Sequence, residues 1–374
     1  MCLMKVLHVN KLYYPHIGGI ENAVRTLAIG LKDKVDVEVL VANKQLKTVV
    51  EIVDGVKVTR VASLGRLRSA PMASGFISQL KRAKSDIYHF HFPNPTGEIS
   101  YLAARPDGKL IVTYHSDIVR QKTLLKLYRP FLEKFLDSAD QIIAFSPNLI
   151  ENSPFLQKVK GKCMVIPFGI QADWLALTPQ VKQKADEIRQ KHGQRIAFFL
   201  GRLIYYKGVD YLIRAMQDVD GKLIIAGEGD LEPELRKLAH DLKLDDRVEF
   251  VGTLSSKELA AYYHACDAFV LPSTESSEAY GIVQLEAHAC GKPVISTNLP
   301  TGVPFVNKDG VSGLVVPPKV SQALSEAINR LFSDDGLRNK LGAQAKERFE
   351  KEFTSEIMVG RIVKLYQNVL ESNN

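Results

Sequence analysis

Strand-like and helix-like segments alternate along almost the whole chain, and this alternation limits the folds that the sequence can adopt. In the first half, short runs rich in β-branched and aromatic residues predict strands at 5–9, 36–42, 86–92, 110–114 and 141–145. Helical periodicity between them predicts helices at 20–31, 75–84 and 121–136. The second half repeats the pattern, with strands expected at 196–200, 222–226, 248–251, 268–271, 294–296 and 313–316. Such alternation produces parallel sheets covered on both faces, so we expect an α/β protein with two doubly wound domains.

The length of the chain and the position of its Pro and Gly residues indicate where a domain boundary is expected. At 374 residues the chain exceeds the size at which a single core keeps growing. A strand-like run enters Pro167 and Gly169 before the polar stretch 178–194, so we place the domains at 1–170 and 171–354. No apolar run has the roughly 18 residues of a membrane-spanning helix, and the first strand follows the start without a signal-peptide pattern. With four scattered cysteines that lack metal-ligand spacing, the sequence indicates a cytoplasmic protein.

Several loops follow the expected strands directly, where doubly wound sheets bind their ligands. Arg202 and Lys207 come after the strand 196–200 and before a helix, and such cations suit a diphosphate. The alternative is that Arg202 and Lys207 are ordinary surface cations without a ligand. The Gly227-Glu228 turn and the Thr253-Leu254 pair follow the next two strands and could line the same pocket, although most glycine turns are merely tight.

Two loops of the first half also follow strands. Gly18 and Gly19 open a helix, where free N–H groups and the helix dipole attract anions. A plain helix-entry turn is the alternative reading. His115 follows the strand 110–114 directly, whereas His89 and His91 alternate within one strand, a pattern typical of structural histidines.

Of two glutamates, Glu278 precedes a helix expected to start at Gly281, and Glu286 lies within that helix. At 100° per residue, Glu286 shares a face with apolar residues, while Gln284 and His288 are expected to face away. A carboxylate among apolar groups needs a hydrogen-bond donor, which either the protein or a ligand could supply. A buried structural carboxylate and an ordinary helix-start acid remain the alternatives.

The glutamate pair, separated by seven residues and followed by Gly-Lys-Pro-Val-Ile, resembles the E-x7-E signature of the family 4 retaining glycosyltransferases. The Gly-Gly, Gly-Arg…Lys-Gly and Gly-x-Gly loops, and a Pro-x-Gly-Ile hinge at 167–170, occur in the order found in that family. The resemblance covers nearly the whole chain. It implies the GT-B fold, two Rossmann-like domains facing across a cleft, with the last helix, 355–374, packing back on the N-terminal domain.

The resemblance also implies roles for individual residues. It assigns catalytic contacts to His115, Arg202, Lys207 and Glu278. It assigns donor binding to Gly18, Gly19, Gly227, Glu228, Ala279, Tyr280, Gly281, Ile282 and Glu286. Thr253 and Leu254 are expected to bind the donor for a different reason, since at the end of their strand they can offer backbone groups to the base. The segment 298–305 departs from the Gly-Gly and Glu that many members carry, and it is closer to members that build bacterial surface polysaccharides. The departure leaves the choice of sugar open.

The expected reaction moves a hexose from a GDP- or UDP-linked sugar to a hydroxyl of a lipid-linked glycan, such as lipopolysaccharide O-antigen or capsule. No cofactor and no metal are expected, because the loop cations can neutralise the departing diphosphate. A sugar-nucleotide epimerase of the same fold and a non-catalytic nucleotide-sugar-binding protein are the alternatives. The first would act on the donor alone, and the second would not need the cationic loop.

The net charge of +7 is unevenly distributed. Residues 57–84 include seven basic residues and no acidic one: Lys57, Arg60, Arg66, Arg68, Lys81, Arg82 and Lys84. This stretch predicts association with an anionic membrane surface, the inner face of the cytoplasmic membrane. Nucleic acid is disfavoured, because the stretch lacks interleaved aromatic residues and any groove-reading motif. A solvated face without a partner is the alternative.

Overall fold

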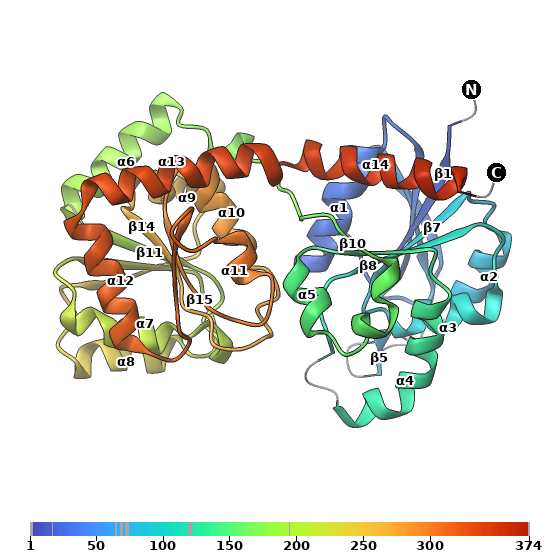
Figure 1. Cartoon of the computed structure of the whole chain (residues 1–374), viewed down its shortest axis with the longest axis horizontal. Helices are drawn as coiled ribbons and strands as arrows, with labels where there is room; N and C mark the ends of the chain where they lie inside the picture. Colours follow the sequence, from blue (N-terminus) through green and yellow to red (C-terminus); the bar gives the residue numbers. More distant parts are fainter. Residues whose placement is uncertain are drawn as a thin grey trace. The chain divides into compact units, whose positions relative to one another are not determined.

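The computed structural model describes residues 3–16, 18–63, 66–67, 70–71, 75–118, 122–193 and 195–372, without the side chains at 66, 67, 70, 71 and 122–124. The chain forms two compact units (Figure 1). Unit 1 consists of Met1–Gly169 together with Ser355–Asn374, and unit 2 is the continuous stretch Ile170–Thr354. No helix in the described part of the chain is both long enough and apolar enough to cross a membrane.

Unit 1 is built on an eight-stranded sheet with the order β10-β9-β8-β7-β1-β2-β4-β3. The strands are β1 (Lys5–Val9), β2 (Asp36–Ala42), β3 (Val49–Val53), β4 (Val56–Val61), β7 (Ile87–Phe92), β8 (Lys109–Tyr114), β9 (Gln141–Ala144) and β10 (Cys163–Val165). A short separate ribbon pairs β5 (Arg66–Leu67) with β6 (Ala70–Pro71). Neighbouring strands of the main sheet are parallel except β3, which pairs antiparallel with β4 at the edge.

Helices cover both faces of this sheet. They are α1 (Gly19–Leu31), α2 (Gly75–Arg82), α3 (Pro95–Ala104), α4 (Lys122–Asp137), α5 (Pro147–Asn152), the 3₁₀ segment η1 (Leu156–Lys162) and α14 (Ser355–Glu371). One face carries an apolar core to which α2, α4 and α5 contribute Phe76, Leu132 and Ile150. On the opposite side of the unit α14 packs against α1, and Gly30 is where the two approach closely, since a Cβ there would collide with Val359.

Unit 2 contains a six-stranded, fully parallel sheet with the order β13-β12-β11-β14-β15-β16. Its strands are β11 (Ile196–Leu200), β12 (Lys222–Ala226), β13 (Val248–Gly252), β14 (Ala268–Leu271), β15 (Val294–Thr297) and β16 (Gly313–Val316). Counted within the unit, this order is 3-2-1-4-5-6, the doubly wound Rossmann arrangement. Its chain order reverses between β11 and β14, and such a reversal marks where ligands bind.

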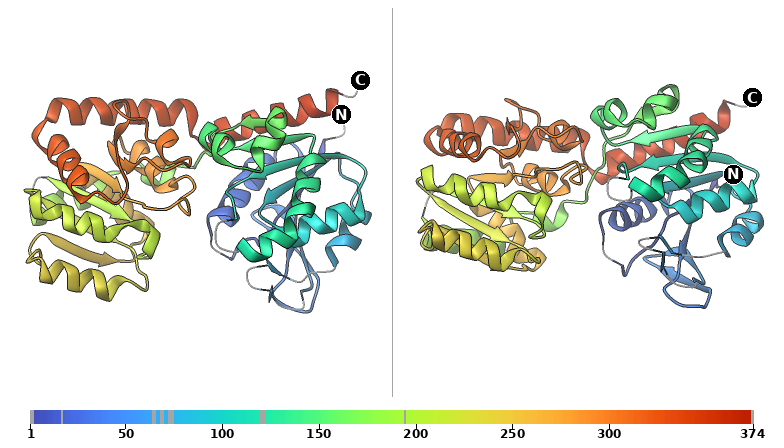
Figure 2. Two further views of the ribbon diagram at one scale, coloured as in Figure 1. Left: turned by 60° about the horizontal axis from the view of Figure 1, so that its bottom comes forward. Right: turned by 90° about the horizontal axis from the view of Figure 1, so that it is seen from below.

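Helices cover both faces of the sheet in unit 2 (Figure 2). An apolar cluster is buried on each face. One layer contains α7 (Val209–Ala215), α8 (Glu232–Asp241) and α12 (Ser321–Ser333); the other contains α6 (Pro179–His192), α9 (Ser256–Ala265), α10 (Ile282–Ala289) and α11 (Val303–Val306). The remaining elements are α13 (Asp335–Glu352), η2 (Asp173–Leu175), η3 (Tyr205–Lys207) and η4 (Met216–Asp218).

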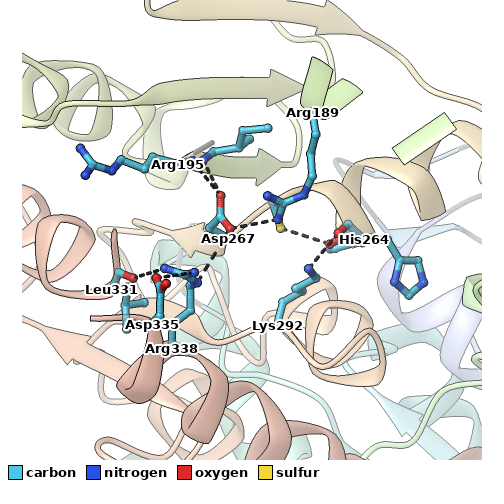
Figure 3. Close-up of polar contacts among 11 residues, drawn as sticks. Arg189, Arg195, His264, Asp267, Lys292, Leu331, Asp335 and Arg338 are labelled. Atoms are coloured by element: carbon cyan, nitrogen blue, oxygen red, sulfur yellow. Dashed lines mark hydrogen bonds and ion pairs between the residues drawn. The ribbon is translucent and has the colours of Figure 1, made fainter. Parts of the chain in front are cut away.

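A buried aspartate ties together the amino ends of β11 and β14 (Figure 3). Asp267 precedes β14 and accepts hydrogen bonds from the main-chain N–H groups of Arg195, at 3.0 Å, and Ile196, at 2.9 Å. The Arg189 guanidinium pairs with its other oxygen at 2.9 Å. These contacts lie at the amino edge of the sheet, so this polar cluster stabilises the framework on the side away from the switch point.

Most of the expected elements are present, with ends that shift by one or two residues. The expectation that the first half is purely parallel is wrong at one edge, because the β3–β4 hairpin adds an antiparallel strand. The helix α3 was also missed. It begins with Pro95 and includes Gly97, two residues that disfavour a helix in sequence patterns, while the Asn94 side chain caps its start.

Candidate functional site

The candidate site of unit 2 lies at the carboxyl edge of its sheet, at the switch point between β11 and β14. The loop after β11 carries Arg202 and Lys207, and the loop after β14 carries Ser273 and Glu278. The two loops meet in an ion pair, in which Lys207 Nζ lies 2.6 Å from Glu278 Oε2. The structure therefore brings together two of the four expected catalytic residues.

The ion pair is largely removed from water. Each of the two side chains is 11% exposed, and the Ser273 hydroxyl donates a second hydrogen bond to the same Glu278 oxygen at 3.1 Å. The alternative reading of Lys207 as an ordinary surface cation is wrong, because its side chain turns inward from η3 onto Glu278. Glu278 is not a helix-start acid either, since residues 278–281 precede α10. Arg202, by contrast, is exposed.

Two glycine loops interlock beside this pair. The Leu203 N–H donates to the Glu228 carbonyl at 2.9 Å, and the Gly227 N–H donates to the Gly252 carbonyl at 2.8 Å. Gly227 has φ +116°, and a Cβ there would collide with the Gly201 carbonyl, so only glycine fits. This packing places Gly227 and Glu228 beside the Arg202 loop. Thr253, exposed, and Leu254, half-buried, follow at the carboxyl end of β13.

Glu286, in the helix α10, has its hydrogen-bond donor within the protein. The Tyr263 hydroxyl donates to Glu286 Oε2 at 2.6 Å. Burial raises the pKa of Glu286 to about 7, although the hydrogen bond from Tyr263 acts in the opposite direction. A carboxyl with this pKa exists in both protonation states near neutral pH.

The expected facing of α10 is wrong. Gln284 and His288, which were expected to face away from the core, are fully buried, and Glu286 is only half-buried. The angles between these residues are the same whether the helix begins at the N-cap Gly281 or at Ile282, so the error lies in the assumption that only one face of the helix is covered. The helix also packs against α13, which buries the side assumed to face solvent.

The segment between the two glutamates is held by the loop that departs from the family pattern. The Gly302 N–H donates to the Ala279 carbonyl at 2.8 Å. Tyr280 and Gly281 are buried, whereas Ala279 and Ile282 are half-buried. The segment 298–305 is therefore in direct contact with the expected donor-binding backbone.

Unit 1 presents Gly18, Gly19 and His115 on loops that follow β1 and β8. Gly18 is the N-cap of α1, and the Glu21 carboxylate lies so close that a Cβ on Gly18 would collide with it. A carboxylate thus already lies at this helix start, a contact that the sequence pattern did not reveal. His115 is buried, its Nε2 lies 3.1 Å from His91 Nδ1, and burial lowers its pKa to about 3.

In the structure, some of the basic residues in the stretch 57–84 pair with acidic residues from outside the stretch. Lys57 pairs with Glu38 at 2.9 Å and Arg60 with Glu51 at 2.5 Å, both acids coming from neighbouring strands. Lys81 and Arg82 are exposed in the last turn of α2. Arg68 lies outside the described residues, as does the side chain of Arg66.

Two groups of side chains bear on metal binding. Asp218-Val219-Asp220 is an Asp-x-Asp sequence, but Asp220 pairs with Arg195 at 2.6 Å near the amino end of β12, away from the site. In unit 1, the ring nitrogens of His8, His89 and His91 lie within 4.8 Å of one another. The candidate site of unit 2 contains neither group.

Comparison with known proteins identifies the family. Residues 17–174 match the family model of glycosyltransferase family 4, and residues 181–348 match that of the group 1 glycosyl transferases. The chain is 37% identical to the O-antigen chain mannosyltransferase C of Escherichia coli, over 99% of this chain and 100% of that protein. It is 34% identical to the D-rhamnosyltransferase WbpZ of Pseudomonas aeruginosa, over 94% of this chain and 93% of that protein.

The fold is also found among solved structures. The crystal structure of Anabaena Alr3699/HepE in complex with UDP superposes with a TM-score of 0.78 at 22% identity, covering 98% of this chain and 100% of that one. Together with the two parallel-sheet units, this likeness confirms the expected GT-B class of fold. The matched family models and the two curated relatives confirm the resemblance read from the sequence, and the chain belongs to the glycosyltransferases of family 4 and group 1.

Proposed function

We propose that this glycosyltransferase moves a hexose from a GDP- or UDP-linked donor to a hydroxyl of a lipid-linked glycan during O-antigen biosynthesis, with retention of anomeric configuration. The observation that carries the proposal is the pair Lys207–Glu278 at the switch point of unit 2, with the exposed Arg202 on the same loop. The names of the two curated relatives support mannose or rhamnose as the sugar transferred.

The site suits a diphosphate leaving group. Negative charge develops on the diphosphate as the glycosidic bond breaks, and a fixed cation nearby stabilises that charge in the transition state. Lys207 is held in place by Glu278, and the Arg202 guanidinium can bind two phosphate oxygens at once. These two cations would take the part that a metal ion plays elsewhere, so the proposed reaction needs no metal.

The glutamates suit two ends of the donor. Glu286, with its pKa of about 7, can accept hydrogen bonds from ribose hydroxyls when ionised, and Tyr263 orients its carboxyl group. Glu278 would contact the transferring sugar while it holds Lys207. No separate nucleophile stands out among the described residues of the site, so attack on the face from which the diphosphate departs fits best, with the diphosphate accepting the acceptor's proton.

The donor is tested by stabilisation and by product analysis. A panel of GDP-, UDP- and ADP-sugars is screened for a rise in melting temperature, because a bound donor stabilises the fold by mass action. The stabilising donor is then incubated with and without a lipid-linked glycan. Transfer that requires the acceptor and gives a product with the donor's anomeric configuration supports the proposal. Conversion of the sugar nucleotide alone would instead identify an epimerase.

Arg202→Ala tests the diphosphate site. Losing a bidentate phosphate contact should weaken nucleoside diphosphate binding about ten-fold or more, without loss of stability, because the side chain is exposed. The matched control is Arg214→Ala, an exposed arginine in the last turn of α7, away from the carboxyl edge. Calorimetric titration of the free nucleotide should separate the two variants. Equal affinity in both would remove Arg202 from the site.

Association with the inner face of the cytoplasmic membrane is part of the proposal. Lys81 and Arg82 are exposed in α2, and Leu127 and Phe131 in α4 are 75% and 49% exposed. The neighbouring α2, α3 and α4 would present these cations and apolar side chains to anionic lipid. Co-sedimentation with anionic but not neutral vesicles, lost on raising salt and in the double variant Lys81→Glu/Arg82→Glu, tests this. Equal sedimentation with both vesicles at low salt would refute it.

A further inference from the structure

Unit 1 contains a continuous chain of buried hydrogen-bonding side chains that ends at His115. His89 Nε2 lies 2.6 Å from Thr113 Oγ1, and its Nδ1 lies 2.6 Å from the hydroxyl of Tyr366. That hydroxyl lies 3.3 Å from His8 Nε2. The chain continues from His8 Nδ1 to His91 Nε2 at 2.9 Å.

The last step, 3.1 Å from His91 Nδ1 to His115 Nε2, joins this chain to the expected donor site. All of its members are buried: His8, His89, His91, Thr113, His115 and Tyr366. They come from the adjacent strands β1, β7 and β8, from the residue that follows β8, and from α14, which supplies Tyr366.

Charge restricts what these rings can do. Burial lowers the pKa values of His8 and His115 to about 3 and holds those of His89 and His91 well below the usual range. All four imidazoles are therefore neutral at physiological pH, and each has one N–H donor and one acceptor nitrogen. The Tyr366 hydroxyl has a single proton, so it donates to one of its two histidines and accepts from the other. If every hydrogen bond in this series is made, all of them must consequently run in the same direction, either from Thr113 towards His115 or from His115 towards Thr113.

The two senses differ at both ends. In the first, Thr113 donates to His89, every later N–H or O–H donates to the next group, and His115 accepts at Nε2 and carries its proton on Nδ1. In the second, every bond is reversed, His115 carries its proton on Nε2, and the Thr113 hydroxyl proton is left over. No other side-chain hydrogen bond of Thr113 is found within the described ranges, so the second sense strands a buried donor, which is costly. The first sense is favoured.

A metal ion fits these nitrogens less well. Two ligands of a tetrahedral zinc ion with bonds of about 2.0–2.1 Å lie roughly 3.3 Å apart. The 2.9 Å separation of His8 Nδ1 and His91 Nε2 is that of a hydrogen bond. In addition, each of the three histidines already uses both ring nitrogens in hydrogen bonds.

We propose that Tyr366, Thr113, His8 and His91 are positioning residues that fix His115 as the Nδ1–H tautomer, so that it offers one defined donor to an oxygen of the bound sugar. The contact with sugar rests on the proposed function. The fixed tautomer does not, because it follows from the chain alone. The helix α14 thereby takes part in the donor site through its tyrosine hydroxyl rather than through direct contact.

The test uses the full-length protein labelled with ¹⁵N in its histidines, because the two ring nitrogens of a neutral imidazole have different chemical shifts with and without the proton. The His115 signals, identified by their loss in His115→Gln, should show one protonated Nδ1 in the wild type. Tyr366→Phe removes the shared hydroxyl and Thr113→Val removes the group that sets the sense, so both should give averaged tautomers. Thr113→Ser should restore the wild-type signals. The control, Tyr128→Phe, removes a buried hydroxyl without a partner in the described part of the chain, and should change nothing.

Activity then connects the chain to the sugar. With an active donor and acceptor, Tyr366→Phe and Thr113→Val should lower kcat/KM about two- to ten-fold, the effect of one hydrogen bond, while Thr113→Ser and Tyr128→Phe retain it. Unchanged His115 shifts in Tyr366→Phe would overturn the proposal, as would one equivalent of bound metal that shifts the signals of His8, His89 and His91. A wild type that shows the fixed tautomer but no transfer with any donor would refute the proposed function and leave the positioning chain established.

Discussion

The Lys207–Glu278 ion pair makes a quantitative prediction about the stability of unit 2. Removing one member of a buried pair leaves the other charge without compensation, which costs about 3–5 kcal/mol. Both side chains are only 11% exposed, so solvent screens the remaining charge poorly. In Lys207→Met, Glu278 keeps the hydrogen bond from Ser273, which offsets about 1 kcal/mol. We therefore expect Lys207→Met to lose about 2–4 kcal/mol.

The partner variants complete a double-mutant cycle. Glu278→Gln should lose about 1–3 kcal/mol, because the amide oxygen can still accept a hydrogen bond from Lys207. The double variant Lys207→Met/Glu278→Gln leaves no unpaired charge, so it should lose at least about 1 kcal/mol less than the sum of the single losses. A positive coupling of this size identifies a charge pair rather than two independent packing contacts.

Urea unfolding followed by tryptophan fluorescence suits this measurement. The chain has a single tryptophan, Trp174, and it lies in unit 2 with both members of the pair. The matched control is Lys237→Met, whose partner Asp241 lies at 2.6 Å but whose side chain is 74% exposed. It should change stability by less than about 0.5 kcal/mol. Single variants that each lose less than about 1 kcal/mol and add without coupling would refute the reasoning.

Two further predictions concern carboxyl groups whose pKa is raised by loss of solvation, Glu98 and Glu286. Burial raises the pKa of Glu98 to about 8, so the folded state retains a proton that the unfolded chain loses near pH 4.5, and wild-type stability falls as the pH rises between these values. Glu98→Gln keeps the hydrogen bond from the Asn94 N–H. Its free energy of unfolding, measured by chemical denaturation, should match that of the wild type below pH 4.5 and exceed it by up to roughly 3–5 kcal/mol at pH 9. A constant difference at all pH values would contradict this. Tyr263→Phe removes the hydrogen bond that lowers the pKa of Glu286, so a ¹³C NMR titration of that carboxyl should move to higher pH, and an unchanged midpoint would show that Tyr263 does not stabilise the ion.

The sequence predicts the framework of this protein well, because its strands are buried on both faces. Strands such as β1, β2, β11 and β16 begin and end at the residues expected from the sequence. The strand β3 is different, since its residues are partly or fully exposed at the sheet edge and give only a weak pattern. Where burial does not select the side chains, periodicity carries little information.

For the site, the sequence predicts residue types and loops but not their partners. Lys207 and Glu278 are 71 residues apart, and no local pattern indicates that they form a pair. The same holds for Tyr263, whose hydroxyl reaches Glu286 from a different helix. The predicted facing of α10 was wrong for another reason: the helix packs against α13 as well as against the sheet, so both of its faces are covered. Contacts of this kind depend on how elements pack, and a single sequence does not specify that.

The division of the chain also has a consequence for the order of synthesis. Unit 2 is one uninterrupted stretch, Ile170–Thr354, so it can fold as soon as that stretch leaves the ribosome. Most of unit 1 is synthesised before unit 2, but unit 1 is completed last, because α14 is synthesised only after all of unit 2. Until then the strands β1 and β7, which carry the buried histidines, lack the helix α14 and its Tyr366. A nascent chain halted after Thr354 should therefore hold a protease-resistant unit 2 beside a protease-sensitive unit 1.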